Sequence, residues 1–249
     1  MMIDGLGALQ LAFAALVVFG AFIVRGMTGF GAGMVAIPLL VFVMPIRTAV
    51  PVVSVLVFVL FLFLMFRDWE HVVREELKRL VPAALLGVVA GALLFATLAS
   101  ALLLQLLALF IMGYAVYSVA VHYFGLPEVS CSERWAYPAG FIGGLVDTIF
   151  GGGGGTPVVI YMHLRRVGRA EFRATVAALW FVEMVARILG YAVAGLYTGD
   201  ALLLCVILLP LVWAGTRVGE RIGNRISQAA FTRLVAALLF FTGTTLLLK

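Results

Sequence analysis

Four ionisable residues that lie inside or directly beside long apolar stretches of the sequence are candidates for chemistry, because a charged side chain is costly there. They are Arg25, Asp147, Glu183 and Arg187. Each costs on the order of 2.5–3.5 kcal/mol at the centre of a bilayer, so each is expected to have a partner or a task. An arginine there can contact an anion, and a carboxylate can take up and release a proton. We therefore expect the two arginines to contribute to an anion-binding site and the two carboxylates to couple protons.

Structural pairing is the alternative for the same four residues. Glu183 and Arg187 are four positions apart, so one helix would place them on the same face, where they can form an ion pair. Arg25 and Asp147 stand at roughly equivalent places, each just before a glycine cluster, and could pair with each other. The sequence leaves both interpretations open.

The two glycine clusters are GMTGFGAG (Gly26–Gly33) and FGGGGG (Phe150–Gly155). The first N–H groups of a helix lack internal partners and carry the positive end of the helix dipole, so they bind anions. Glycine lets a ligand approach that backbone closely. If a half-helix begins at each cluster, its first N–H groups form a pocket for a small anion. The predicted substrate-binding residues are Arg25, Thr28, Gly29, Phe30, Gly31, Gly33, Gly151, Gly152, Gly153, Gly154, Gly155, Thr156 and Arg187.

Glycine-mediated helix packing is the alternative interpretation of these clusters. Glycine is a poor helix former, and the second cluster has five in succession (Gly151–Gly155), which would not hold a helix well. A second cluster at the equivalent place of the chain also favours ligand binding.

Composition places these residues in a membrane protein. Of the 249 residues, 64% are hydrophobic and 12% are charged, and the mean hydropathy is +1.18. This excludes an ordinary soluble enzyme and a disordered chain. The net charge of +5 is interpreted as setting orientation in the bilayer rather than binding nucleic acid. Cys131 and Cys205 form no metal or disulfide pattern, and we expect no cofactor and no metal site.

The apolar runs predict an all-α polytopic membrane protein built from two repeats. A crossing needs roughly 20 residues, and the runs at Phe30–Met44, Trp135–Phe150 and Thr156–His163 are too short to cross comfortably. Each of these three adjoins a glycine cluster. Each half of the chain thus resembles a broken re-entrant hairpin followed by three transmembrane helices, with repeat one at 6–121, a linker at 122–134 and repeat two at 135–248. The runs are Leu6–Val24, Phe30–Met44, Val50–Phe66, Val81–Leu98, Ala101–Val121, Trp135–Phe150, Thr156–His163, Ala174–Gly195, Ala201–Thr216 and Ala230–Leu248.

The basic residues predict the topology of this single transport domain. Each half crosses the membrane an odd number of times, so the second half must be inverted relative to the first. With both termini on the non-cytoplasmic side, Arg47 and Lys249 are the outside cations, and twelve others obey the positive-inside rule. The twelve are Arg67, Arg74, Lys78, Arg79, Arg134, Arg165, Arg166, Arg169, Arg173, Arg217, Arg221 and Arg225.

The cytoplasmic segment 67–80 is also expected to form an amphipathic helix on the membrane interface. Trp69, Val73, Leu77 and Leu80 would lie on its apolar face. On the polar face, Glu70 and Arg74, and likewise Glu75 and Arg79, are spaced to pair.

Three motifs resemble the TauE/SafE family of sulfite exporters. They are GFGAGMVAIPLL (Gly29–Leu40), FGGGGGTPVVIY (Phe150–Tyr161) and GRAEFRAT (Gly168–Thr175). The second differs from the family pattern by one extra residue among the glycines and by Thr156 in place of a proline. The resemblance implies transport of small sulfur-containing anions, such as sulfite, sulfoacetate or related organosulfonates, across the bacterial cytoplasmic membrane.

We therefore predict a secondary transporter, an exporter that works by alternating access, and not an enzyme. Its partners are a small anionic substrate and the lipid bilayer, and nucleic acid is not among them. A passive anion channel and an intramembrane enzyme are the alternatives, but Ser54, Ser100 and Ser118 lack a nucleophile motif. Coupling to protons or sodium ions and assembly into a homo-oligomer stay open.

Overall fold

The computed structural model describes residues 7–28, 31–65, 69–124, 131–153, 155–222 and 228–247. Within these ranges the chain is helical, with two short 3-10 helices and no strand. The elements are α1 (Ala8–Thr28), α2 (Ala32–Leu40), α3 (Ile46–Met65), η1 (Trp69–His71), α4 (Arg74–Thr97), α5 (Ser100–Phe124), η2 (Glu133–Trp135), α6 (Ala136–Phe150), α7 (Gly155–Leu164), α8 (Arg169–Val193), α9 (Gly199–Ile222) and α10 (Gln228–Leu247).

The lengths of these helices follow the predicted apolar runs. Five described stretches are long and apolar enough to cross a membrane: Ala8–Met27, Arg74–Thr97, Ser100–Val121, Ala170–Val193 and Gly199–Ile222. By contrast, α2 has nine residues and α7 has ten. At 1.5 Å per residue these two are far shorter than the hydrocarbon core. The short helices beside the glycine clusters are thus confirmed.

The predicted amphipathic helix over 67–80 is wrong. Residues 69–71 form η1, and the next helix, α4, begins at Arg74 and continues without interruption to Thr97. The paired charges also differ from the prediction, since Glu75 pairs with Lys78 at 3.0 Å and Arg79 pairs with Glu76 and Glu133. The first, polar turns of α4 are therefore continuous with its apolar part. In these turns Glu75, Glu76, Lys78 and Arg79 form ion pairs with neighbouring charged side chains.

The described helices belong to two compact units. Unit 1 comprises Met1–Leu56, Leu98–Gly125 and Tyr197–Lys249, and unit 2 comprises Val57–Thr97 and Leu126–Leu196. Each unit therefore combines segments from both halves of the sequence.

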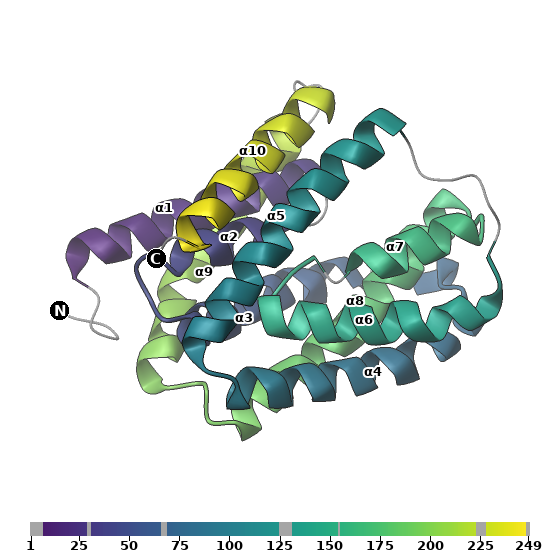
Figure 1. The fold of residues 1–249 in the computed structure, drawn as a ribbon, viewed down its shortest axis with the longest axis horizontal. Helices are drawn as coiled ribbons and strands as arrows, with labels where there is room; N and C mark the ends of the chain where they lie inside the picture. The colour runs from purple at the N-terminus through teal and green to yellow at the C-terminus, as the bar shows by residue number, and fades with distance from the viewer. Residues whose placement is uncertain are drawn as a thin grey trace. The chain divides into compact units, whose positions relative to one another are not determined.

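In unit 1, α1 packs on α9, and α5 packs on α10 (Figure 1). The crossing of α1 and α9 depends on Gly26, Gly215 and Gly219. A Cβ on Gly26 would collide with the carbonyl oxygen of Thr216, and a Cβ on Gly219 with that of Ile23. The backbones of the two helices therefore touch directly, as in membrane proteins whose helices meet at small residues.

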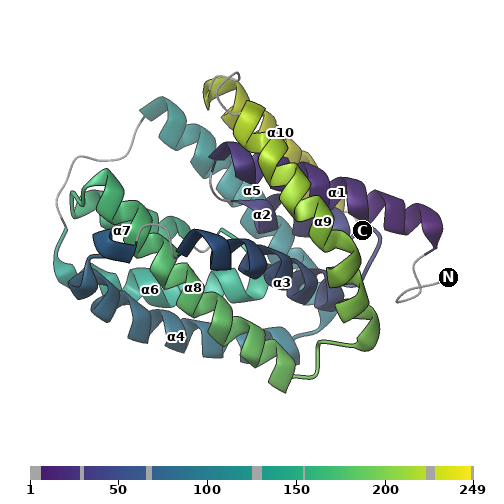
Figure 2. The same cartoon turned by 180° about the vertical axis from the view of Figure 1, so that it is seen from behind.

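In unit 2, α4 lies along α6 and also contacts α8 (Figure 2). Here too glycines line the crossing. A Cβ on Gly87 would collide with the carbonyl oxygen of Phe141, and a Cβ on Gly144 with that of Ala84. A buried apolar cluster that includes Leu80, Val158 and Leu179 joins α4, α7 and α8. This packing places the start of α7 beside α8.

Candidate functional site

The second glycine cluster breaks the chain between α6 and α7. Gly151 (φ 68°) and Gly153 (φ 88°) both adopt the left-handed conformation, which only glycine adopts without strain. The N–H of Gly151 donates to the carbonyl oxygen of Asp147 at 2.8 Å, and that of Thr156 donates to Gly153 at 3.2 Å. Among the described residues no hydrogen bond is recorded for the N–H groups of Gly152 and Gly153. The turn therefore presents backbone donors at the start of α7.

Two side chains of α8 hold the end of α6. Arg187 donates a hydrogen bond through Nη1 to the carbonyl oxygen of Asp147, and the Tyr191 hydroxyl donates to the carbonyl oxygen of Thr148. The last carbonyl groups of a helix have no partner within the helix, so these bonds satisfy them. Arg187 is 2% exposed and Tyr191 is fully buried. A buried positive charge thus lies directly against the glycine turn.

Glu183 lies one turn before Arg187 on α8 and is 4% exposed. Asp147 and Arg187 are the charged groups that act on it electrostatically. The structure records no ion pair between Glu183 and Arg187, although their spacing favoured one. The guanidinium instead donates to the carbonyl oxygen of Asp147 at the end of α6, which also accepts from the N–H of Gly151. Asp147, Glu183 and Arg187, three of the four predicted ionisable residues, are therefore brought together.

The first glycine cluster opens α2 in unit 1. Gly31 has φ 88°, and the N–H of Val35 donates to its carbonyl oxygen at 3.2 Å. Among the described residues, no heavy atom other than those of its chain neighbours lies within 4 Å of a Cβ built on Gly31. Gly33 is buried within α2, and Arg25, in the last turn of α1, is 3% exposed.

Several predicted site residues cannot be placed at this level of detail. Gly29, Phe30, Gly154 and the side chain of Thr28 lie outside the described residues. Arg25 belongs to unit 1 and Asp147 to unit 2, so their pairing stays a prediction.

One side chain beside the second cluster was not predicted. The indole of Trp180, on α8, packs against Gly155, the first residue of α7. A tryptophan in an apolar helix is typical of a packed core, so the sequence carried no signal for a role at the glycine turn.

Comparison with known protein families identifies the chain. The model of the family described as Sulfite exporter TauE/SafE matches residues 14–246, which is nearly the whole chain. The chain belongs to the TauE/SafE family. Proteins of this family are membrane transporters, and the five candidate spans fit a multi-pass membrane protein. No curated protein and no solved structure matches the chain.

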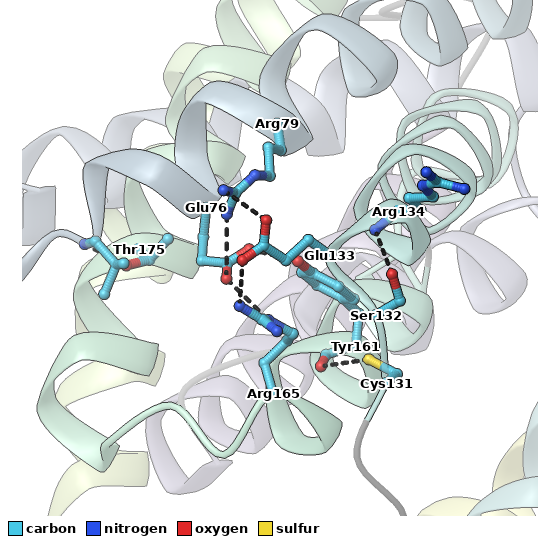
Figure 3. Close-up of polar contacts among 10 residues, drawn as sticks. Glu76, Arg79, Cys131, Ser132, Glu133, Arg134, Tyr161, Arg165 and Thr175 are labelled. Atoms are coloured by element: carbon cyan, nitrogen blue, oxygen red, sulfur yellow. Dashed lines mark hydrogen bonds and ion pairs between the residues drawn. The ribbon is translucent and has the colours of Figure 1, made fainter.

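The far end of α7 in this TauE/SafE protein is fixed by a charged cluster (Figure 3). The Tyr161 hydroxyl donates to the carboxylate of Glu76, and Arg165 Nε donates to Glu76 Oε1 at 3.0 Å. Glu133 accepts from Arg165 at 3.1 Å and from Arg79 at 2.8 Å. Arg79 closes the ring, with its Nη1 3.7 Å from Glu76 Oε1.

Glu76 is the buried member of this ring, at 4% exposed. A buried carboxylate is costly unless it is paired and hydrogen-bonded, and Glu76 has two arginines and a tyrosine around it. The hydrogen bond between Arg165 and Glu76 raises the pKa of the Arg165 guanidinium above its ordinary value. The ring joins α4, η2 and the end of α7, three segments that sequence spacing alone does not connect. The ring therefore anchors α7 at the end opposite the glycine turn.

Proposed function

We propose that this TauE/SafE protein is a secondary transporter that exports small sulfur-containing oxyanions. Sulfite, sulfoacetate and related organosulfonates are the substrate class. The observation that carries the proposal is the start of α7, where backbone N–H groups of a glycine turn lie beside the buried guanidinium of Arg187. Both features attract an anion and neither requires covalent chemistry. The family description supports sulfur oxyanions and the outward direction.

The start of α2 is proposed to supply the second half of the binding site. The inverted order of the two halves would bring the two half-helix starts to the membrane midplane from opposite faces, as in other inverted-repeat transporters. Gly31, before α2, has the same left-handed conformation as Gly153, before α7, and this likeness supports the proposal. Alternating access would then expose this site to one side of the membrane at a time.

The inverted repeat itself is supported by an exchange of helices. If the first half is α1–α5 and the second is α6–α10, the first helix of each half packs on the fourth helix of the other half. Thus α1 packs on α9, and α6 packs on α4. Glycines line both crossings. A pseudo-twofold relation that exchanges the two halves would convert one crossing into the other.

The same arrangement is proposed to place the protein in the bacterial cytoplasmic membrane with both termini outside. The ring of Glu76, Arg79, Glu133 and Arg165 would then lie at the cytoplasmic ends of α4 and α7. This agrees with the excess of basic residues assigned to that side.

Uptake into proteoliposomes tests the function. Purified protein should transport sulfite or an organosulfonate in a saturable manner. Added sulfate or chloride should not reduce the rate of this transport. The Gly31→Ala variant should lose ligand-dependent thermal stabilisation, because its φ of 88° strains any side chain and disturbs the start of α2. The matched control is Gly113→Ala in α5, where a Cβ meets no atom within 4 Å.

Two results would contradict the proposal. Absence of both transport and thermal stabilisation with every sulfur oxyanion would remove the substrate class. A flux that is not saturable and runs only down the anion gradient would indicate a passive channel instead of a secondary transporter.

A further inference from the structure

The Trp180 indole lies directly against the proposed anion site. A Cβ built on Gly155 would collide with Cζ2 of Trp180 and lie 3.2 Å from its Nε1. The nitrogen edge of the ring therefore faces the first residue of α7. The ring is held in place by Phe61, which meets it edge-on at a centroid distance of 5.8 Å.

Within the part of the chain that the structure describes, the indole nitrogen at this position has no protein acceptor. Nε1 of Trp180 is buried and lacks a hydrogen-bond partner among the described residues. A buried indole N–H usually has a hydrogen-bond partner, because a buried donor without one loses the hydrogen bond that it would make with water. The indole N–H of Trp180 lies against the start of α7 and is therefore suited to donate to an oxygen atom of a bound substrate.

Two other buried polar atoms lie on the same stripe of α8. Glu183 and Arg187 follow Trp180 at three and seven positions, which is the spacing of one helix face. Oε1 of Glu183 and Nε of Arg187 also lack hydrogen-bond partners among the described residues, and both side chains are more than nine-tenths buried. Arg187 is fixed at the glycine turn by its bond to Asp147. Unsatisfied polar groups therefore gather around the same turn, independently of the helix start itself.

We propose that the indole N–H of Trp180 donates a hydrogen bond to an oxygen of the transported anion at the start of α7. This assignment rests on the proposed function and names a substrate-contacting residue of that site. An indole N–H donates and cannot accept, so it favours an anionic oxygen. The indole is also uncharged. Its hydrogen bond therefore orients the bound anion without binding it so tightly that release is prevented.

The test replaces the donor and keeps the shape of the ring. In a background with Trp69→Phe, Trp135→Phe and Trp213→Phe, position 180 carries either tryptophan or benzothienylalanine, in which sulfur replaces the N–H. Affinity for sulfite and for sulfoacetate is measured on both proteins in detergent by calorimetry. We expect the sulfur analogue to bind roughly 10-fold to 100-fold more weakly, as for a lost hydrogen bond to a charged group. Its melting temperature without ligand should match that of the tryptophan protein.

A simpler variant pair supports the same test in the otherwise natural chain. Trp180→Phe should weaken anion binding, whereas Trp213→Phe should not, because Trp213 is an exposed side chain on α9.

The outcomes separate this inference from the function on which it rests. Equal affinity of the two ring types at position 180, with anion binding intact, overturns the role of Trp180 and leaves the transporter proposal standing. A lower melting temperature with unchanged affinity assigns Trp180 to packing and overturns the inference as well. If the wild-type protein binds no sulfur oxyanion, the proposed function fails, and the role of Trp180 fails with it.

Discussion

At the scale of single residues, the buried charges of α8 are stabilised by the backbone of a neighbouring helix. Arg187 and Tyr191 donate to the last carbonyl groups of α6, which have no partner in their own helix. The guanidinium of Arg187 is thus paired inside an apolar segment, although the carbonyl that it binds also accepts from the N–H of Gly151. The carboxyl of Glu183 is left beside the charges of Asp147 and Arg187 without a direct ion pair.

The first prediction concerns proton coupling by Asp147 and Glu183. In proteoliposomes, an imposed pH gradient should drive anion uptake by the wild type, whereas Asp147→Asn and Glu183→Gln should abolish that response, because an amide cannot take up and release the proton. Counterflow exchange of the anion in the absence of a gradient should persist in both variants. If the variants respond to the pH gradient as the wild type does, these carboxylates do not couple protons, and a sodium gradient is the next driving force to measure.

At the scale of elements, the helices of unit 2 are held by close backbone contact at one end and by charges at the other. Glycines let α4 and α6 approach each other, and the ten-residue α7 packs through Val158 in the apolar cluster with α4 and α8 and is also fixed at both of its ends. The Trp180 ring packs on its first residue. The Glu76 ring, through Tyr161 and Arg165, binds its last turn.

Substitution at the α4–α6 crossing should test this packing. Gly144→Ala should lower the free energy of unfolding by about 1–3 kcal/mol, because the new methyl group would collide with the carbonyl of Ala84 and push the helices apart. Gly113→Ala in α5 is the control, and its added helix propensity should stabilise by up to about 1 kcal/mol. Thermal unfolding in detergent measures both. Equal stability of the two variants would mean that the crossing is not closely packed.

At the scale of the whole molecule, segments of the two sequence halves alternate between the two compact units. Unit 1 takes α9 and α10 from the second half, and unit 2 takes α4 from the first. This exchange is the reason that neither proposed repeat, 6–121 or 135–248, coincides with a compact unit.

The inverted topology predicts the accessibility of introduced cysteines in intact cells. Single cysteines placed in 67–80 and 164–173, in a variant without Cys131 and Cys205, should react with a permeant reagent only. Cysteines near either terminus should react with an impermeant reagent added outside, because each half crosses the membrane an odd number of times. Labelling of the termini and of the 67–80 segment from the same side would exclude the inverted repeat.

The sequence was most informative where the bilayer restricts the chain. Apolar run length predicted the short helices α2 and α7, because few lengths suit a hydrocarbon core. It was least informative where contacts join distant segments. The start of α4 was mispredicted because Glu76 and Arg79 are neutralised by Glu133 and Arg165, which lie far away in sequence. Trp180 was overlooked because only the fold places it against Gly155.

The exchange of α4 and α9 also bears on how the chain is made. During synthesis, α1 is made long before its packing partner α9 has been translated. Until then the surface of α1 around Gly26, next to Arg25, is not covered by α9. Unit 2, whose segments end at Leu196, can be complete while α9 and α10 of unit 1 are still in the ribosome. A nascent chain stalled when α8 has left the ribosome but α9 has not would therefore hold one finished unit and one unfinished unit. The unfinished unit is the one we expect membrane quality-control proteases to recognise.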